Sequence, residues 1–155
     1  AEQVLADGCA DMVSMARPFL ADENWVKKAM ENKADEINTC IACNQACLDH
    51  TFSNKRASCL VNPRACHEIE LNYSPTPNKK KIAVVGSGPA GLTFSYIAAE
   101  RGHDITLFDS ESELGGQFNM AKKIPGKEEF YEPLRFWKKQ LDLQKARSRQ
   151  LSSVE

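Results

Sequence analysis

Four cysteines lie within 20 residues of this 155-residue chain, at positions 40, 43, 47 and 59. Thiolates are soft ligands, which favour zinc or an iron–sulfur cluster. Structural zinc sites usually take two short pairs of ligands, whereas here three ligands share one tight segment and the fourth stands apart. That grouping suits a [4Fe-4S] cluster, in which each iron takes one cysteine. The spacing differs from the common ferredoxin patterns, so zinc, disulfides and free thiols are alternatives at this point.

The other cysteines and the nearby histidines are expected to take no part in metal binding. Free cysteine is commonly buried and inert, so we expect Cys9 and Cys66 to be buried thiols. With four thiolates available, neither His50 nor His67 is needed as a ligand. Four cysteines crowded into one stretch of a chain this long also favour a metal site in a reducing compartment over a disulfide framework.

A glycine-rich turn follows the cysteines. Residues 86–91, GSGPAG, fit the G-x-G-x-x-G pattern, with Gly86, Gly88 and Gly91 as its glycines and Ala90 before the last. In dinucleotide-binding folds the first glycine permits a tight turn, the second lets the backbone approach a pyrophosphate, and the third lets helix and strand pack closely. The phosphates then lie at the N-terminus of the helix. The turn therefore predicts a Rossmann βαβ unit that binds a dinucleotide.

Residues beyond the turn favour FAD as that dinucleotide. Asp109 ends the second predicted strand, about where a ribose-binding carboxylate is expected. A second glycine pair, residues 115–116, would allow another close approach of backbone to ligand, which suits an extended dinucleotide such as FAD better than NAD. Gln117 and Lys127 are then candidate polar contacts with FAD.

Composition and charge exclude several classes of partner. The chain has 20 basic and 21 acidic residues and a net charge of −1, so no overall field attracts nucleic acid or an anionic membrane. No apolar run reaches the roughly 18 residues of a membrane span, and the first residues lack the pattern of a signal peptide. We expect a small-molecule substrate or a protein partner, with no nucleic acid and no membrane.

The hydrophobic pattern predicts an α/β protein in two parts separated by a linker. Before the linker we expect a strand over residues 11–16 and a helix over 21–33, then a loop region with short helical turns over 38–68. Residues 71–80 carry two prolines and form the linker. After it come a strand over 82–85, a helix over 89–101, a strand over 104–108, and an amphipathic helix from Lys127 that places four apolar residues on one face: Phe130, Leu134, Trp137 and Leu141.

These motifs, in this order, resemble the bacterial-type 2,4-dienoyl-CoA reductases of the NADH:flavin oxidoreductase, old yellow enzyme and trimethylamine dehydrogenase group. The resemblance covers residues 1 to about 144 and rests on the runs ADGCADMVSMARPFLAD, CIACNQAC, CLVNPRACHE, KIAVVGSGPAGL, LGGQF and IPGKEEFYE. It implies the end of an FMN-binding TIM barrel over 1–36, an iron–sulfur segment over 37–70, the linker over 71–80, the start of a Rossmann-like FAD domain over 81–144, and an atypical tail over 145–155.

The resemblance also implies a function. In that family, electrons pass from NADPH through FAD and a [4Fe-4S] cluster to FMN, which reduces an unsaturated acyl-CoA in fatty acid β-oxidation in the cytoplasm. By this resemblance, Ala16 and Arg17 hold the FMN phosphate. The four cysteines Cys40, Cys43, Cys47 and Cys59 bind the cluster. The FAD contacts would be Gly86, Gly88, Ala90, Gly91, Asp109, Gln117 and Lys127.

Two rival functions follow from the same residues. Relatives within the group act on amines and on other enones, and no residue of this chain decides between substrates. A rival from another class is a zinc- and nucleotide-binding module without redox activity. Because a TIM barrel needs eight strands and the resemblance covers only the last, we expect a fragment that has no catalytic residues and is inactive alone. The acyl substrate, the choice between NADPH and NADH, and the oligomeric state are not decided by the sequence.

Overall fold

A computed structural model describes residues 1–147 of the chain. Its regular part, residues 81–147, is called the Rossmann unit below. Strand β1 (Lys81–Val85) leads into helix α5 (Pro89–Glu100), which returns to strand β2 (Asp104–Phe108). The two strands pair in parallel, with Ala83 opposite Thr106. The predicted strand, helix and strand are thus confirmed, with boundaries that differ by at most one residue.

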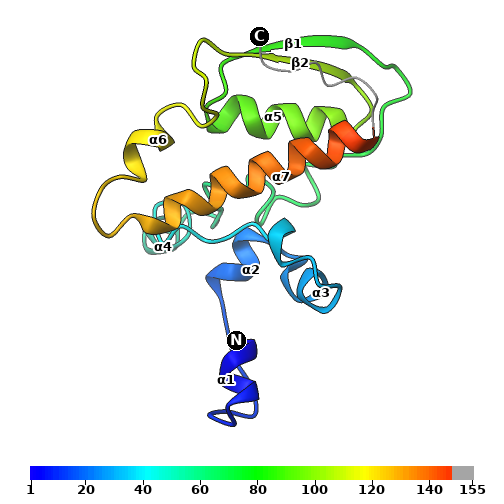
Figure 1. Ribbon diagram of the computed structural model, residues 1–155. Coiled ribbons are helices and arrows are strands. Elements are labelled where there is room, and N and C mark those ends of the chain that lie inside the picture. The colour runs from blue at the N-terminus through cyan, green and yellow to red at the C-terminus, as the bar shows by residue number, and fades with distance from the viewer. Residues whose placement is uncertain (148–155) are drawn as a thin grey trace.

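The Rossmann unit is layered, with the sheet, α5 and then α7 (Tyr131–Arg147) following one another (Figure 1). Helices α5 and α7 bury an apolar core together with strand β2. The amphipathic helix predicted from Lys127 is confirmed in its apolar face, although a 3-10 turn, η2 (Glu128–Phe130), precedes α7. The buried members of the core are Leu92, Leu107, Phe136, Trp137 and Leu141.

The connection between β2 and α7 holds one short helix that the sequence did not predict. Helix α6 (Phe118–Ala121) has only four residues, so it carries no periodic signal. The expected tail begins inside α7, which continues to Arg147; the rest of the predicted tail, residues 148–155, lies outside the described residues.

The N-terminal residues form short helices and no strand. Helices α1 (Glu2–Ala6), α2 (Arg17–Ala21) and α3 (Trp25–Met30) are followed by a 3-10 turn, η1 (Ala34–Glu36). The strand predicted over residues 11–16 is wrong for this structure, because that stretch is irregular and pairs with no other part of the described chain. An isolated strand leaves its backbone groups unpaired, so its sequence pattern alone does not hold it extended.

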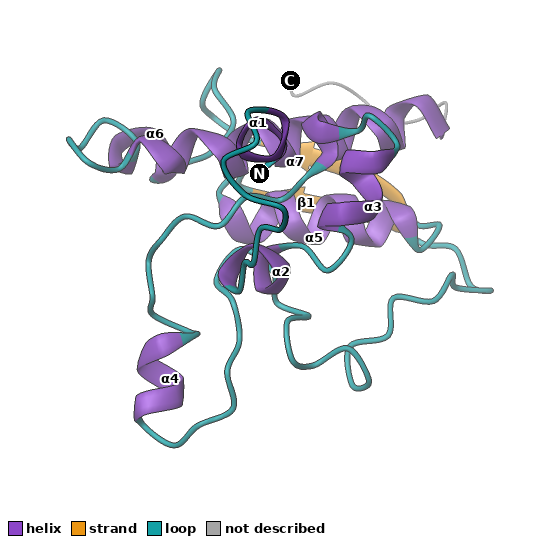
Figure 2. Cartoon of the chain, turned by 90° about the horizontal axis from the view of Figure 1, so that it is seen from below, coloured by secondary structure: helices purple, strands orange, loops and turns teal. Residues whose placement is uncertain are grey.

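The predicted loop region is confirmed. Residues 37–70, called the cysteine segment below, contain one regular element, helix α4 (Leu48–Phe52). Figure 2 shows α4 at the far end of a loop that extends away from α5 and α7. The linker that follows is tied to the end of α5, since Arg101 donates to the Ser74 carbonyl oxygen at 3.2 Å and the Thr76 N–H donates to the Arg101 carbonyl oxygen at 2.8 Å.

Helix α7 joins the Rossmann unit to the cysteine segment. Its Arg135 guanidinium donates to the carbonyl oxygens of Asp35 and Ile37, the latter at 2.8 Å. Lys139 forms an ion pair with Asp35 at 2.6 Å. The chain entering the cysteine segment is therefore held against α7 by charge-assisted hydrogen bonds.

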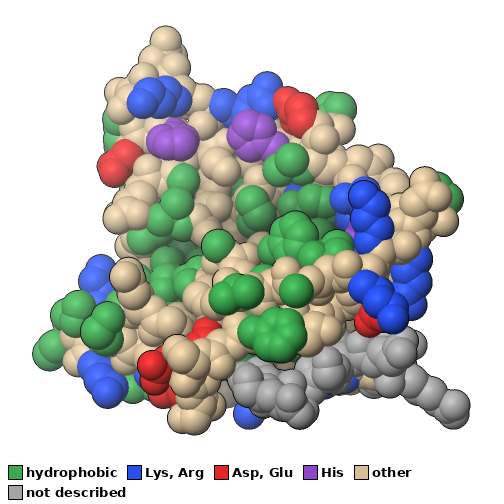
Figure 3. Space-filling view, turned by 90° about the horizontal axis from the view of Figure 1, so that it is seen from above, with side chains coloured by type: hydrophobic (Ala, Val, Ile, Leu, Met, Phe, Trp, Pro, Cys, Tyr) green, Lys and Arg blue, Asp and Glu red, His purple; other side chains and the backbone are tan. Residues whose placement is uncertain are grey.

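Within residues 1–147, helices cover only one face of the sheet (Figure 1). Val85 on the outer face is 86% exposed, and Figure 3 shows hydrophobic side chains gathered on the side of the molecule seen from above. No helix among residues 1–147 is both long enough and apolar enough to cross a membrane.

Candidate functional site

The glycine turn has the geometry that the pattern predicts. Gly86 has a φ of +98°, which favours glycine. A Cβ added to Gly91 would lie 1.9 Å from the Gly86 carbonyl oxygen, so only glycine lets α5 approach the end of β1 this closely. A Cβ on Gly88 would meet nothing within 4 Å, so open space faces this residue. The turn thus supplies the three roles of a dinucleotide loop, with Ala90 in the first turn of α5 behind it.

Asp109 is turned back onto this loop. Its carboxylate accepts hydrogen bonds from the backbone N–H of Ser87 and, at 2.8 Å, from that of Glu111. The Ser87 hydroxyl and these backbone N–H groups hold the pKa of Asp109 at about 2, well below its usual range. The carboxylate therefore stays charged at neutral pH and braces the loop at the place where a ribose would lie.

The second glycine pair lies against the same loop. A Cβ on Gly116 would come within 3.1 Å of the Gly88 Cα, and the Gly115 N–H donates to the Ser87 carbonyl oxygen at 2.8 Å. Gln117 follows directly and is exposed next to the loop. Lys127 lies apart from it, with its ammonium group 5.5 Å from the centre of the Phe130 ring, in a connection that extends away from the start of α5 (Figures 1 and 2).

All four clustered cysteines line one small cavity. Two hydrogen bonds, one from a side chain and one from the backbone, bring the distant Cys59 to the other three. The Asn38 side chain donates to the Val61 carbonyl oxygen at 2.8 Å, and the Ser58 N–H donates to the Ala46 carbonyl oxygen at 2.7 Å. The segment is thereby closed into a loop whose thiols face a common space.

The local backbone favours ligand binding by these thiols. Ala42 and Asn44 have φ values of +53° and +59°, which curl the chain around Cys43. The Ala42 N–H donates to the Cys40 sulfur at 3.4 Å, the kind of hydrogen bond that stabilises a bound thiolate. The surroundings of Cys59 act in the opposite direction, because burial and proximity to Cys40 and Cys43 raise the pKa of its thiol and so disfavour the thiolate.

The donor set consists of four thiols that line one cavity. Among residues 1–147, no group of three or more His, Cys, Asp or Glu side chains is arranged so that it could hold a metal ion. All six cysteines lie in the described part of the chain and all are free thiols, so the disulfide alternative is not realised here.

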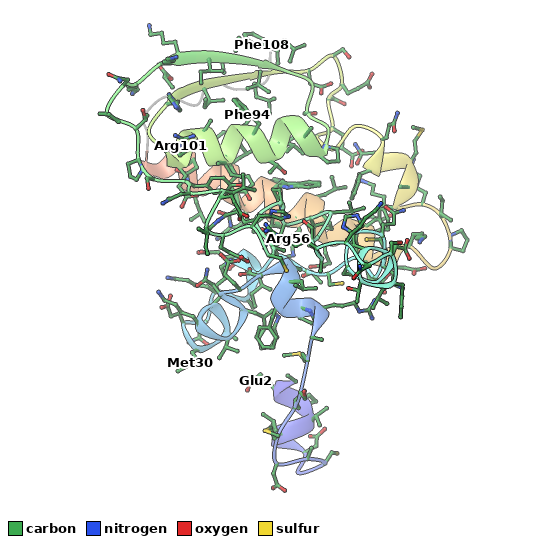
Figure 4. All side chains as sticks on the ribbon, turned by 180° about the vertical axis from the view of Figure 1, so that it is seen from behind. Glu2, Met30, Arg56, Phe94, Arg101 and Phe108 are labelled. Atoms are coloured by element: carbon green, nitrogen blue, oxygen red, sulfur yellow. The ribbon has the colours of Figure 1, made fainter. Side chains whose placement is uncertain are left out.

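Cys9 and Cys66 correct the prediction made for them, because both are exposed. Neither has an apolar layer over it, although free cysteine is commonly buried. His50 and His67 instead engage Arg56, whose guanidinium lies 3.1 Å from the His67 Nδ1 and whose carbonyl oxygen lies 3.0 Å from the His50 Nδ1. Figure 4 shows Arg56 among the side chains of the cysteine segment.

Arg17 is brought to the cysteines, which the sequence did not predict. It begins α2, directly after Ala16, and lines the same cavity as the four thiols. Its guanidinium donates to the Asn44 side-chain oxygen at 2.7 Å. Asn44 lies between Cys43 and Cys47 and has a left-handed backbone conformation. Asparagine is enriched in that conformation, so its residue type was the available sequence signal.

Comparison with known proteins connects these sites to redox enzymes. Residues 84–141 match the NAD(P)-binding Rossmann-like domain. The chain is 45% identical over 130 residues to a metal reductase from Desulforamulus reducens (84% of this chain, 20% of the relative). It is 43% identical over 129 residues to an NADH oxidase from Thermoanaerobacter brockii (82% of this chain, 20% of the relative).

A solved structure of the complex of 2-naphthoyl-CoA reductase with 2-naphthoyl-CoA superposes with a TM-score of 0.89 at 37% identity, over 93% of this chain and 22% of that one. The chain thus spans about a fifth of the length of the relatives it matches. Its matches run from the N-terminal helices through the cysteine segment into the Rossmann unit, since they cover more than four-fifths of the chain.

Proposed function

We propose, on the premise that this chain is homologous to a segment of larger oxidoreductases, that it is the electron-transfer segment of an iron–sulfur flavoprotein. Cys40, Cys43, Cys47 and Cys59 would hold a [4Fe-4S] cluster, and the glycine loop would hold FAD. The observation that carries the proposal is the single cavity around which the fold gathers all four thiols.

The grouping of the cysteines supports a cluster over one zinc ion. Structural zinc sites usually take two short pairs of ligands. Here Cys40, Cys43 and Cys47 share one tight segment and Cys59 stands apart, although all four line the same cavity. A [4Fe-4S] cluster, in which each iron takes one cysteine, suits that grouping.

Each residue then has a definable task. An iron–sulfur cluster, when bound, supplies one-electron transfer, while a flavin exchanges electrons with a nicotinamide. Gly88 leaves room for a pyrophosphate at the start of α5, and the charged Asp109 would accept hydrogen bonds from ribose hydroxyls. Arg17, which lines the cysteine cavity, would offer its guanidinium to an FMN phosphate, with Ala16 supplying a backbone amide.

For the whole protein, we propose electron transfer from NADPH through FAD and the cluster to FMN, with an unsaturated acyl-CoA as the substrate. The superposition with 2-naphthoyl-CoA reductase favours an acyl-CoA thioester. Gln117 and Lys127 are proposed as further FAD contacts, of which Gln117 is supported by its position beside the loop.

A second candidate is an amine oxidoreductase with the same segment. It is favoured by homologues that include a dimethylamine dehydrogenase from a Hyphomicrobium species. In both candidates residues 1–147 would hold the redox groups rather than the substrate, so the two share the chemistry of the cysteine cavity and the glycine loop.

Metal and flavin analysis of the chain, purified without oxygen, tests the proposal. We expect about four irons and four acid-labile sulfides per chain, a brown colour and binding of added FAD. Cys43→Ser should lose most of the iron, because three thiolates remain for four corners. Cys66→Ser is the matched control and should keep it, since Cys66 is exposed and lies outside the cavity. One zinc per chain without colour would establish the zinc- and nucleotide-binding rival instead.

A further inference from the structure

One side chain packs against both apolar clusters, the one beneath the glycine loop and the one behind the cysteines. The ring of Phe118 packs against the core of the Rossmann unit, where its centre lies 5.6 Å from that of Trp137 in an edge-to-face arrangement. The same ring packs against the small core of Ala21, Ile41 and Val61 that backs the cysteines. Phe118 is the residue that these two apolar clusters share.

The backbone of Phe118 is fixed by the glycine loop. Its N–H donates to the Gly115 carbonyl oxygen at 3.1 Å, and the Gly115 N–H in turn donates to Ser87 of the loop. Gly116, two residues before Phe118, lies against Gly88. A ligand that orders residues 86–88 therefore also restricts residues 115–118, which position the ring.

On its other side, the ring touches the layer that carries the thiols. Ile41 stands between Cys40 and Cys43, and Val61 follows Cys59 by two residues. Cys40, Cys43 and Cys59 pack against the same small core. Phe130 closes the contact, with its ring centre 5.0 Å from that of Phe118. Metal binding that orders the three thiols therefore also restricts the surface on which the Phe118 ring rests.

We propose that Phe118 is a positioning residue that couples the two sites, so that metal on the cysteines and FAD on the glycine loop each strengthen the binding of the other. This inference rests on the proposed function, because it needs both ligands. Coupling between sites is reciprocal, and it requires a physical element on which both sites act. The Arg135 contacts do not supply that element, since they join α7 to residues 35–37 and do not reach the glycine loop.

Titration calorimetry with FAD, on the complete chain with and without its iron and sulfide, measures this coupling. We expect FAD to bind at least about five-fold more tightly to the iron-loaded chain than to the metal-free chain, the usual lower range for coupled sites. In Phe118→Ala the ratio of the two affinities should fall to about one. General loosening of the fold would weaken both affinities and leave their ratio unchanged, so the ratio reports coupling rather than stability.

Two further variants keep the test decisive. Phe118→Leu retains an apolar contact and should keep part of the ratio, even if the alanine variant fails to fold. Phe52→Ala removes a ring of the same cysteine segment that is 84% exposed, and should behave as the unaltered chain.

The outcomes distinguish a failure of the coupling from a failure of the proposed function. An unaltered chain that takes up no iron, or binds no FAD, would overturn the proposed function and the coupling with it. An unaltered chain that binds both, but with a ratio of one, would overturn the coupling alone. A ratio that survives in Phe118→Ala would assign the coupling to another contact.

Discussion

The Rossmann unit and the cysteine segment are held together by different physical means. The Rossmann unit has a paired sheet, two long helices and five buried apolar side chains in its core. The cysteine segment has one five-residue helix, and its core of Ala21, Ile41 and Val61 is completed by thiols. Burial and sheet hydrogen bonding are therefore more extensive in the first region, and we expect the second to depend on a bound metal.

The backbone shows the same difference. Among residues 1–147, four of the five non-glycine residues with positive φ lie in the cysteine segment: Ala42, Asn44, Asn54 and Cys66. Such conformations cost on the order of 1–2 kcal/mol each when no glycine is present. A segment with so small a core does not offset these costs by burial, so metal–thiolate bonds are expected to supply the difference.

Removing the metal should produce the largest difference between the two regions in amide protection. We expect a metal-free chain to lose most amide protection over residues 38–68, because α4 is too short to persist alone and the apolar core is small. Protection in β1, α5 and β2 should change little. Hydrogen exchange, followed by mass spectrometry on the iron-loaded and metal-free chains, measures both regions in one experiment.

Equal loss of protection in β1 and α5 would show that the Rossmann unit depends on the metal as well, so that the two regions do not differ in their need for a ligand. The Cys66→Ser chain, loaded with iron, is the control, since its cysteine segment should stay protected.

Gly91→Ala should destabilise the Rossmann unit while leaving the four clustered cysteines unaltered. The added Cβ would lie 1.9 Å from a backbone oxygen, which cannot move without separating α5 from β1. We expect a loss of about 3 kcal/mol or more in the free energy of unfolding, at the upper end of overpacking effects. Urea unfolding followed by fluorescence of the buried Trp137 measures it.

Gly88→Ala is the matched control, because a Cβ there meets nothing within 4 Å and its φ of −71° suits alanine. Its free energy of unfolding should change by less than about 1 kcal/mol, while FAD binding weakens as the methyl group enters the space for the pyrophosphate. If both variants unfolded alike, close packing at Gly91 would not be the cause.

The same contrast explains what could be predicted from the sequence. The strands, α5 and the apolar face of α7 were predictable because their apolar residues recur with the period of the element. The glycine pattern and Asp109 were predictable because each role needs a particular residue type at a fixed spacing. The cysteine spacing indicated four candidate ligands but not how Cys59 reaches the other three, since that depends on hydrogen bonds of Asn38 and Ser58.

Other features could not be read from local pattern. The strand expected over residues 11–16 has the right composition, but a strand forms only where partners pair with it. Phe118 follows a glycine pair in a four-residue helix, so nothing in its neighbours marks it as the contact between two cores. The exposure of Cys9 and Cys66 is set by packing at each position, which the average burial of cysteine does not determine.

The smallest effect expected is the pH dependence that Asp109 gives the Rossmann unit. Its pKa is lowered from 3.8 to about 2 by hydrogen bonds from Ser87 and Glu111. A carboxyl group whose pKa is lower in the folded state stabilises the fold above its unfolded pKa, and this contribution is lost as the pH falls through the folded pKa. Unfolding of the metal-free chain should therefore become easier between about pH 4 and pH 2.

Asp109→Asn should reduce this loss of stability at low pH. Asp104→Asn, which removes a carboxylate from the start of β2, controls for the loss of one charge. If the two asparagine variants kept the same dependence on pH as the unaltered chain, the hydrogen bonds of Asp109 would not brace the glycine loop, and the stability of that loop would depend on its glycines alone.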